Sequence, residues 1–212
     1  VYRNPVRQRL DGWQEVCLND EQMNAVASIW QNAAICREHW SREQGMHLLY
    51  GITGSGKTRV YIELIKEVVA KGKQAIMLIP EIALTYQTVK RFVNVFGDRV
   101  SVLNSKMSSG ERYDQFLRAS NGDIDVMIGP RSAIFTPFNN IGIIVLDEEH
   151  EESYRNENTP CYDTREVAKF LTKKHNAPLV LASATPSVKS YYMAQKGEYK
   201  LLKLTKRATA GG

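Results

Sequence analysis

Residues 51–58 read GITGSGKT, and this stretch decides the fold. Its spacing, G-x-x-x-x-G-K-T, is that of a phosphate-binding loop, in which glycines let the backbone turn tightly and direct N–H groups at phosphate oxygens. The motif requires a strand before it and a helix after it. The apolar residues Leu48 and Leu49 supply the strand, and Val60 and Leu64 begin a helical period behind the loop. The sequence therefore predicts a strand, a phosphate loop and a helix in succession.

The loop predicts contacts to a nucleotide and its metal ion. We expect Lys57 to reach the β- and γ-phosphates and the Thr58 hydroxyl to bind Mg²⁺. The expected nucleotide-binding residues of the loop are Gly51, Thr53, Gly54, Ser55, Gly56, Lys57 and Thr58.

The composition is typical of a globular domain. The chain has 212 residues, of which 43% are hydrophobic and 24% are charged, enough for one α/β domain with a buried core. No apolar run approaches the ~20 residues of a membrane span, and no signal-peptide core opens the chain, so we expect a cytoplasmic protein without a membrane partner. The net charge of +5 permits nucleic-acid binding without demonstrating it. Cys17, Cys36 and Cys161 are too far apart to indicate a disulfide framework or a zinc site.

Apolar runs of strand length alternate with helical segments over most of the chain. Strands are predicted at 74–79, 100–103, 123–129, 141–147, 179–182 and 199–204. Such an alternation indicates an α/β fold with a mostly parallel sheet that helices cover on both faces. Ligands in these sheets bind beyond the carboxyl ends of the strands, where the phosphate loop also lies.

Helical patterns separate these strands. From residue 19 or 20 an apolar stripe predicts a helix, and another helix covers residues 83–96. The residues of the first stripe are Met23, Val26, Ala27, Trp30 and Ala33. Two further helices are predicted to open with capping boxes, one at Ser108 with Glu111 and one at Asp163 with Glu166.

Three regions are expected along the chain. Residues 1–18 lack periodicity and read as a linker from an upstream region, 19–206 form the α/β domain, and 207–212 read as a tail or linker. Because the chain begins with Val1 rather than Met, we expect it to be a piece of a longer protein.

A second signal follows the predicted strand at 141–147. The residues Ile143-Ile144-Val145-Leu146-Asp147-Glu148-Glu149-His150 place acids directly at the carboxyl end of a buried strand. Asp147 is expected to hold Mg²⁺ opposite Thr58, and Glu148 to orient or deprotonate an attacking water. Taken alone, His150 would be read as a solvated or a core histidine rather than as a functional one.

A third motif, Ser183-Ala184-Thr185-Pro186, ends the strand at 179–182. Alone it is ordinary turn chemistry. In the order GITGSGKT, DEEH and SAT, however, the three motifs resemble the first, RecA-like motor lobe of superfamily 2 helicases. The resemblance implies catalytic roles for Lys57, Asp147, Glu148 and His150. It also implies that Ser183 and Thr185 couple the nucleotide site to nucleic acid.

More specific stretches narrow the resemblance. LNDEQ (18–22), IPEIALTYQT (79–88), GPRSAIFTPF (129–138) and DEEHEESY (147–154) are similar to the bacterial primosomal replication-restart helicases, the primosomal protein N-prime family. The likeness runs from about residue 18 to the end, and it implies that residues 1–18 are a linker from an upstream DNA-binding region. It implies that Gln22 reads the adenine edge, that the cofactors are ATP and Mg²⁺, and that zinc belongs to a part of the family beyond this chain. The implied partners are single-stranded and forked DNA, primosome proteins and single-strand-binding proteins, in the bacterial cytoplasm at the nucleoid.

Two loops are candidates for contact with DNA. PEIALTYQ and GPRSA each follow a predicted strand and could present Thr85, Gln87, Arg131 and Ser132 to the phosphates of a single strand. The competing interpretation is that the apolar residues of these loops pack in the core; they are Pro80, Ile82, Leu84, Phe135 and Phe138.

The sequence departs from the family between the acidic box and SATP. The family has an aromatic-rich loop there; residues 153–162 keep Tyr154 and Tyr162 but lack the expected tryptophan, and Asp163 stands where histidine is common. Before the acidic box, GPRSA also departs, with Pro130 in place of a usual threonine. DNA sensing through this loop is therefore open.

The function implied is that of the ATP-binding lobe of a 3′-to-5′ DNA helicase, nearly inactive without a second lobe. Two alternatives stay open: another superfamily 2 translocase of repair or restriction, and a nucleotide switch that binds DNA without hydrolysis.

Overall fold

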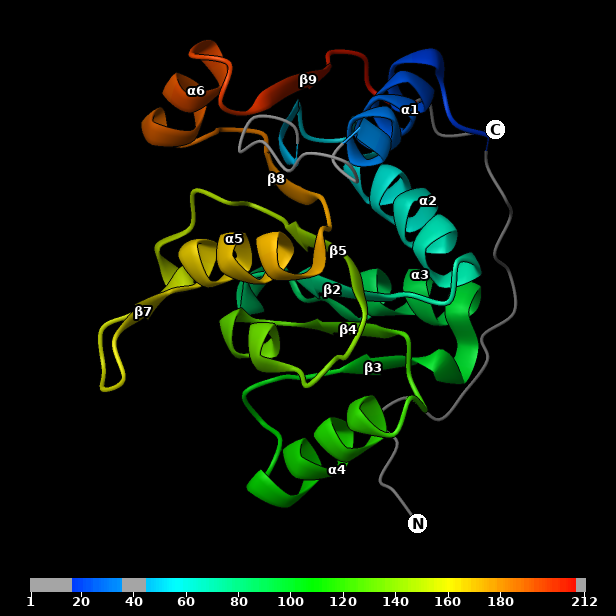
Figure 1. The fold of residues 1–212 in the computed structure, drawn as a ribbon, viewed down its shortest axis with the longest axis vertical. Coiled ribbons are helices and arrows are strands. Elements are labelled where there is room, and N and C mark those ends of the chain that lie inside the picture. Colours follow the sequence, from blue (N-terminus) through cyan, green and yellow to red (C-terminus); the bar gives the residue numbers. More distant parts are fainter. Residues whose placement is uncertain (1–16, 36–44, 209–212) are drawn as a thin grey trace.

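Seven parallel strands form one sheet in the order β3-β4-β2-β5-β8-β1-β9 (Figure 1). The structure is a computed structural model that describes residues 17–35 and 45–208, without the side chains of residues 32–35. The strands are β1 (Met46–Gly51), β2 (Gln74–Leu78), β3 (Val100–Val102), β4 (Val126–Gly129), β5 (Ile141–Leu146), β8 (Leu179–Ser183) and β9 (Lys200–Leu204). The predicted parallel sheet is confirmed, and β9 closes it as a parallel neighbour of β1.

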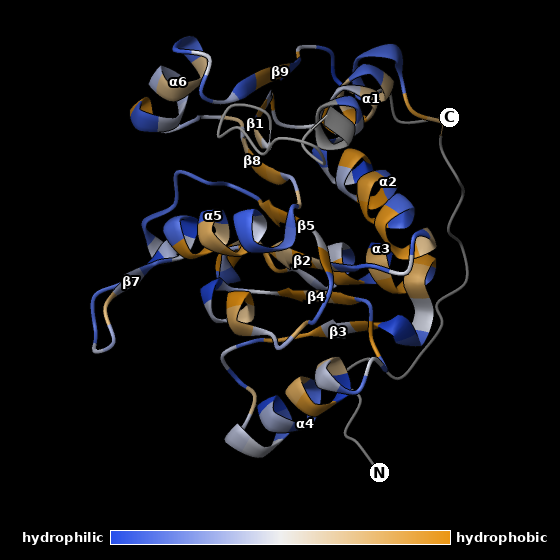
Figure 2. Cartoon of the chain, viewed as in Figure 1, coloured by the Kyte–Doolittle hydropathy of each residue, from blue (hydrophilic) through white to orange (hydrophobic). Residues whose placement is uncertain are grey.

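Six α-helices cover the two faces of this sheet within the described ranges. They are α1 (Asp20–Ile35), α2 (Lys57–Ala70), α3 (Tyr86–Phe96), α4 (Ser109–Ser120), α5 (Thr164–His175) and α6 (Val188–Gln195). One core cluster joins α1, α2 and α3 to the sheet, and a second joins α4 and α5 to its other face, with partly buried residues of α6 at its margin. Both faces are therefore buried, which is why the strands are apolar at almost every position (Figure 2).

Alternation along a single strand divides its side chains between the two clusters. In β4, Val126 and Ile128 belong to the cluster under α2 and α3, whereas Met127 belongs to the opposite one. Successive residues of a strand point to opposite faces, so a strand covered on both sides is apolar throughout. All six residues of β5, which lies at the middle of the sheet, are buried.

The predicted apolar stripe of α1 is confirmed at Val26 and Trp30 and wrong at Met23 and Ala27, while the side chain of Ala33 lies outside the described residues. Met23 is 49% exposed and Ala27 is exposed, whereas Ala25, Val26 and Ile29 are buried. The helix packs on α2 and β9. Its buried face includes the polar residue Gln22, because that side chain bonds the phosphate loop.

The two predicted capping boxes have different outcomes. At α4 both arms are present: the Ser108 hydroxyl accepts from the Glu111 N–H, and the Glu111 carboxylate accepts from the Ser108 N–H. At α5, Asp163 caps the helix by accepting from the Arg165 N–H, but the Glu166 carboxylate accepts from Lys169 Nζ at 2.7 Å instead of turning back. The second box is therefore only half correct.

The apolar residues of the two candidate DNA loops do not all pack in the core. Pro80 and Phe138 are buried, but Ile82 is 88% exposed and Phe135 is 50% exposed. Ile82 lies in the 3₁₀ turn η1 (Glu81–Ala83), and Phe135 ends the 3₁₀ turn η3 (Arg131–Phe135). Both turns follow the carboxyl end of a strand. In η3, Ala133 and Ile134 are buried in the core, whereas Phe135 at its end is exposed. α3 accordingly begins at Tyr86, later than the pattern predicted.

A small antiparallel hairpin of β6 (Arg155–Asn156) and β7 (Tyr162–Asp163) stands apart from the main sheet. It occupies the segment in which the sequence departs from its family. The Tyr154 ring is buried just before it, and Phe135 contacts the Tyr162 ring edge to face at 5.0 Å. No helix among the described residues is long and apolar enough to cross a membrane.

Candidate functional site

The phosphate loop connects β1 to α2 in the predicted order. Gly54 and Gly56 both have left-handed backbones, with φ of 80° and 81°, which residues with a Cβ rarely adopt. Gly56 is the N-cap of α2, and no side chain caps this helix. The first N–H groups of α2 therefore remain available to an anion, as phosphate binding at a helix N-terminus requires.

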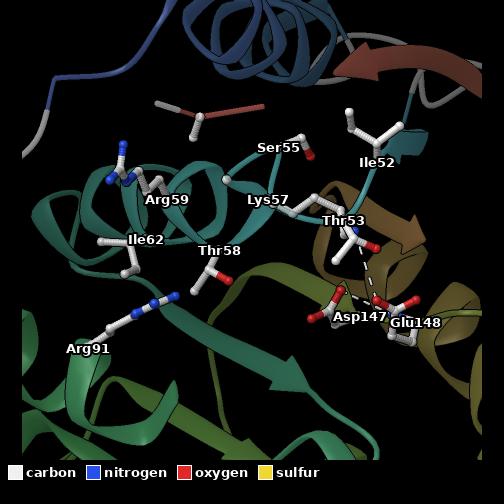
Figure 3. Close-up of a pocket in the computed structure, with 13 residues that line it drawn as sticks. Ile52, Thr53, Ser55, Lys57, Thr58, Arg59, Ile62, Arg91, Asp147 and Glu148 are labelled. Carbon is white, nitrogen blue, oxygen red and sulfur yellow. Dashed lines mark hydrogen bonds and ion pairs between the residues drawn. The ribbon is translucent and has the colours of Figure 1, made fainter. Parts of the chain in front are cut away.

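One cavity of about 590 Å³ brings the loop and the acidic box together (Figure 3). Its lining includes Thr53, Gly54, Ser55, Gly56, Lys57, Thr58, Asp147 and Glu148, all of which the sequence predicted. Ile52, Arg59, Ile62, Arg91 and Ala208 line it as well, and the motifs did not identify them. Gly51, Gln22, His150, Ser183 and Thr185 are not part of the lining.

Lys57 bridges the two halves of this cavity. Its Nζ donates to the Gly51 carbonyl at 2.9 Å and lies 3.9 Å from Glu148 Oε1. An ammonium group with three donors can keep such contacts and still reach a phosphate between them. Gly51 thus contributes through its carbonyl to the placement of Lys57.

Asp147 lies at the carboxyl end of β5 and is held by a buried tyrosine of α2. The Tyr61 hydroxyl donates to Asp147 Oδ1 at 2.8 Å, and the Glu148 N–H donates to the same oxygen at 3.1 Å. Burial raises the pKa of Asp147, and the Tyr61 hydrogen bond works against that rise. The Tyr154 hydroxyl donates to the Asp147 carbonyl at 2.6 Å. No motif indicated Tyr61, although its place one turn after Lys57 would have put it on the same helix face.

Glu148 has a left-handed backbone with φ of 46°, unusual for a residue with a side chain. Its Oε2 accepts from Ser183 Oγ at 3.4 Å, and His150 Nδ1 lies 2.8 Å from the same hydroxyl. Ser183 Oγ also accepts from the Thr185 N–H at 2.9 Å. The structure therefore joins the acidic box to the SAT motif through Ser183. The coupling role of these residues stays a prediction.

Glu149 is fully buried and was not singled out from the sequence. Its carboxylate accepts from the Ser187 N–H at 2.7 Å, from Ser187 Oγ at 3.2 Å and from Ser190 Oγ at 2.8 Å. Its backbone N–H donates to the Ala182 carbonyl at 3.0 Å. The third residue of the acidic box thus fixes the N-terminus of α6, beside the SAT motif.

Gln22 contacts the phosphate loop instead of lining the cavity. Its Nε2 donates to the Ser55 carbonyl at 2.8 Å, and its Oε1 accepts from the Asn19 N–H at 3.0 Å. The side chain is buried, and its two bonds leave one N–H and one lone pair of the amide unused among the described residues. The predicted contact with adenine stays a prediction.

The segment after β9 crosses the phosphate loop. The Ala208 N–H donates to the Gly54 carbonyl at 2.9 Å. The Glu21 carboxylate accepts from the Thr205 N–H at 2.7 Å, the Thr205 hydroxyl at 2.6 Å and the Lys206 N–H at 3.1 Å. These bonds lower the pKa of Glu21. Ala208, predicted as part of the tail, therefore lines the first cavity.

The predicted DNA-contacting residues fall into two groups. Arg131 and Ser132 line a second cavity of about 490 Å³, with Arg112, Asn156 and Tyr162. Arg131 Nη1 donates to the Arg155 carbonyl at 2.6 Å, so it supports the hairpin in this structure.

Thr85 and Gln87 are exposed at the start of α3 and do not line that second cavity. The Thr85 hydroxyl is the N-cap of the helix and accepts from the Thr88 N–H at 3.3 Å.

The residues of the first cavity fit ATP and Mg²⁺. Mg²⁺ is typically bound by one or two carboxylates together with substrate phosphates, and hydroxyl and carboxylate oxygens are the ligands it prefers. Asp147 and Thr58 line the cavity and provide these oxygens, and the loop with Lys57 provides a phosphate cradle.

Comparisons with known proteins identify relatives of the whole chain. A family model described as "Type III restriction enzyme, res subunit" matches residues 15–188. Replication restart protein PriA of Bacillus subtilis (strain 168) is 45% identical over 208 residues, which are 98% of this chain and 25% of that protein. PriA of Chlamydia pneumoniae is 44% identical over 91% of this chain and 25% of that protein. The chain thus spans about a quarter of the length of these curated relatives.

Among solved structures, RecG bound to a three-way DNA junction matches with a TM-score of 0.66 and 25% identity, over 93% of this chain and 25% of that one. The predicted RecA-like architecture is confirmed by this match and by the parallel sheet. The chain therefore belongs to the family of the type III restriction enzyme res subunit, and its resemblance to the bacterial primosomal replication-restart helicases is confirmed.

Proposed function

We propose that the chain is the ATP-binding lobe of an ATP-dependent 3′-to-5′ DNA helicase that acts in replication restart. The observation that carries this proposal is the single cavity that unites Lys57 and Thr58 with Asp147 and Glu148. The PriA relatives support the restart function, and the RecG likeness supports a helicase lobe. The proposed partners are single-stranded and forked DNA, with primosome and single-strand-binding proteins, in the bacterial cytoplasm.

Each residue has a distinct part in the proposed reaction. Lys57 and the N–H groups at the start of α2 bind phosphate oxygens. Asp147 and Thr58 hold Mg²⁺, which when bound would neutralise charge on the phosphates. The Glu148 carboxylate accepts a proton from the attacking water. Its contact with Ser183 offers a route by which His150 and the SAT motif respond to the state of the nucleotide.

Glu148→Gln in the full-length protein tests the proposed hydrolysis. The amide cannot accept a proton from water, so turnover should fall by about 10²-fold or more while ATP binding stays intact. DNA-stimulated phosphate release and equilibrium nucleotide binding measure the two effects. Glu152→Gln, at an exposed position nearby, should change neither. Unchanged turnover in Glu148→Gln would favour the nucleotide switch without hydrolysis.

Substrate preference separates replication restart from the other superfamily 2 translocases. In the full-length protein, ATP hydrolysis should be stimulated more by forked than by linear DNA. Equal stimulation would instead support a repair or restriction translocase. The 212-residue chain alone should bind nucleotide weakly and turn it over negligibly, because arginine fingers contributed by a second lobe are worth ~10³–10⁵ in rate in related NTPases.

A further inference from the structure

One arginine outside every sequence motif lies in the nucleotide cavity. Arg91 is on α3 and lines the cavity together with Thr58 and Asp147. In Figure 3 its guanidinium extends from α3 into the cavity, on the side of Thr58. Arg91 therefore approaches the phosphate-binding part of the site from a helix other than the one that begins at the loop.

The Arg91 guanidinium is available to a ligand. Within residues 17–35 and 45–208, no side chain or carbonyl forms an ion pair or hydrogen bond with it, whereas Lys57 donates to Gly51 and Arg131 to Arg155. The cavity is lined by three cations, Lys57, Arg59 and Arg91, and by the two carboxylates of Asp147 and Glu148. A ligand with several negative charges would complement this excess of positive charge. A guanidinium offers a planar fork of donors that matches phosphate oxygens.

The position of Arg91 is fixed by its helix. Its neighbours Phe92 and Val93 are buried in the core cluster shared with α2, so the backbone of α3 cannot shift freely at this point. Gln87 precedes Arg91 by four residues, and residues with this spacing lie on the same face of a helix, one turn apart. One face of α3 thus carries Arg91, which lines the nucleotide cavity. One turn earlier it carries Gln87, which is predicted to contact DNA.

The geometry points to Arg91 as a further nucleotide-binding residue, whose guanidinium contacts the phosphate oxygens of bound ATP. The inference rests on the proposed ATP site. It assigns α3 a direct place in nucleotide binding, beside Gln87 and the loop that precedes the helix. Arg91 acts in binding rather than as an arginine finger, so its removal should raise KM for ATP more than it lowers kcat.

Steady-state ATP hydrolysis by the full-length protein on single-stranded DNA tests this assignment. Arg91→Ala should raise KM for ATP about tenfold or more, as expected when a hydrogen bond to a charged group is lost. Arg91→Gln, which keeps most of the stem but not the charge, should raise KM in the same direction. Lys90→Ala removes a cation from the same helix that does not line the cavity, so its KM should match the wild type.

Lys57→Ala separates this inference from the proposed function. If nucleotide binding is lost in Lys57→Ala but KM is unchanged in both Arg91 variants, the assignment of Arg91 is overturned and the ATP site stands. If Lys57→Ala binds ATP like the wild type, the proposed site itself is wrong. Because Arg91 is exposed, its variants should have the thermal stability of the wild type in the absence of nucleotide. The KM for ATP of either variant is therefore sufficient to test the assignment.

Discussion

The Asp147 carboxylate illustrates how single residues determine the chemistry of the site. It is half-buried at the end of β5, which raises its pKa, yet it must be ionised for its proposed role as a Mg²⁺ ligand. Tyr61 donates to one of its oxygens at 2.8 Å and so favours the ionised form. A hydroxyl on α2 thus adjusts the protonation of an acid that follows a distant strand.

Tyr61→Phe in the full-length protein should move the acid limb of ATP hydrolysis to higher pH. Without the hydroxyl, the pKa of Asp147 rises further, so protons compete with Mg²⁺ at a higher pH. The pH profile of kcat/KM, recorded at two Mg²⁺ concentrations, measures the shift, which saturating Mg²⁺ should reduce. Tyr113→Phe, at an exposed position on α4, is the matched control. Superimposable profiles for Tyr61→Phe and the wild type would contradict this role.

At the scale of secondary-structure elements, Glu149 connects the end of β5 to the start of α6. α6 has eight residues, its N-cap is Ser187, and of its residues only Ser190 is buried. A helix this short is marginal on its own, so its position depends on tertiary contacts. The buried Glu149 carboxylate provides them by accepting from Ser187 and Ser190.

Glu149→Ala should therefore lower the free energy of unfolding by about 2 kcal/mol or more, because buried donors lose a charged acceptor. Urea unfolding measures the loss. In the wild type the Ser187 N–H donates to Glu149, and the Ser190 N–H donates to the Ser187 hydroxyl. Hydrogen exchange at both N–H groups should accelerate in the variant, while exchange in α4 changes little. Glu152→Ala, at an exposed position, should leave both measurements unchanged. A Glu149 variant as stable as the wild type would show that α6 is held by other contacts.

At the scale of the whole molecule, the doubly covered sheet imposes its environment on every group inside it. His47 in β1 is buried between strands β8 and β9, opposite Lys200 of β9. Burial, helped by the charge of Lys200, lowers the pKa of His47 to about 4. This imidazole stays neutral because the assembled sheet buries it. The sequence of β1 alone does not produce this effect.

This burial predicts a pH dependence of stability. As pH falls below the ordinary histidine pKa, His47 binds a proton in the unfolded chain. In the folded protein it stays neutral until the pH reaches about 4. Stability should therefore fall between about pH 6.5 and 4, with a contribution from His47 of about 3 kcal/mol at most. Urea unfolding of the wild type and His47→Gln at pH 7.5 and 4.5 tests this. The free energy of unfolding should decrease less for the variant than for the wild type between the two pH values. Equal losses would assign the pH dependence to other groups.

Much of the fold and part of the site could be predicted because their signals are local. A phosphate loop needs left-handed glycines and a strand and helix at its two ends, all within about 20 residues of chain. Strands buried on both faces are apolar throughout, which indicated the parallel sheet. Parallel strands bring their carboxyl ends to one edge, which is why Asp147 and Glu148 meet Lys57 in the same cavity.

The sequence by itself thus determined the order of the elements, the parallel sheet and the residues that its motifs name. Tertiary structure alone decided the partners of those residues: Tyr61 lies 86 positions from Asp147 in the chain, and Glu149 lies 38 from Ser187. It also decided which face of α1 is buried and that Ile82 and Phe135 are exposed. The physical reason is that backbone conformation responds to neighbouring residues in the chain, whereas burial and hydrogen bonding depend on which elements pack together.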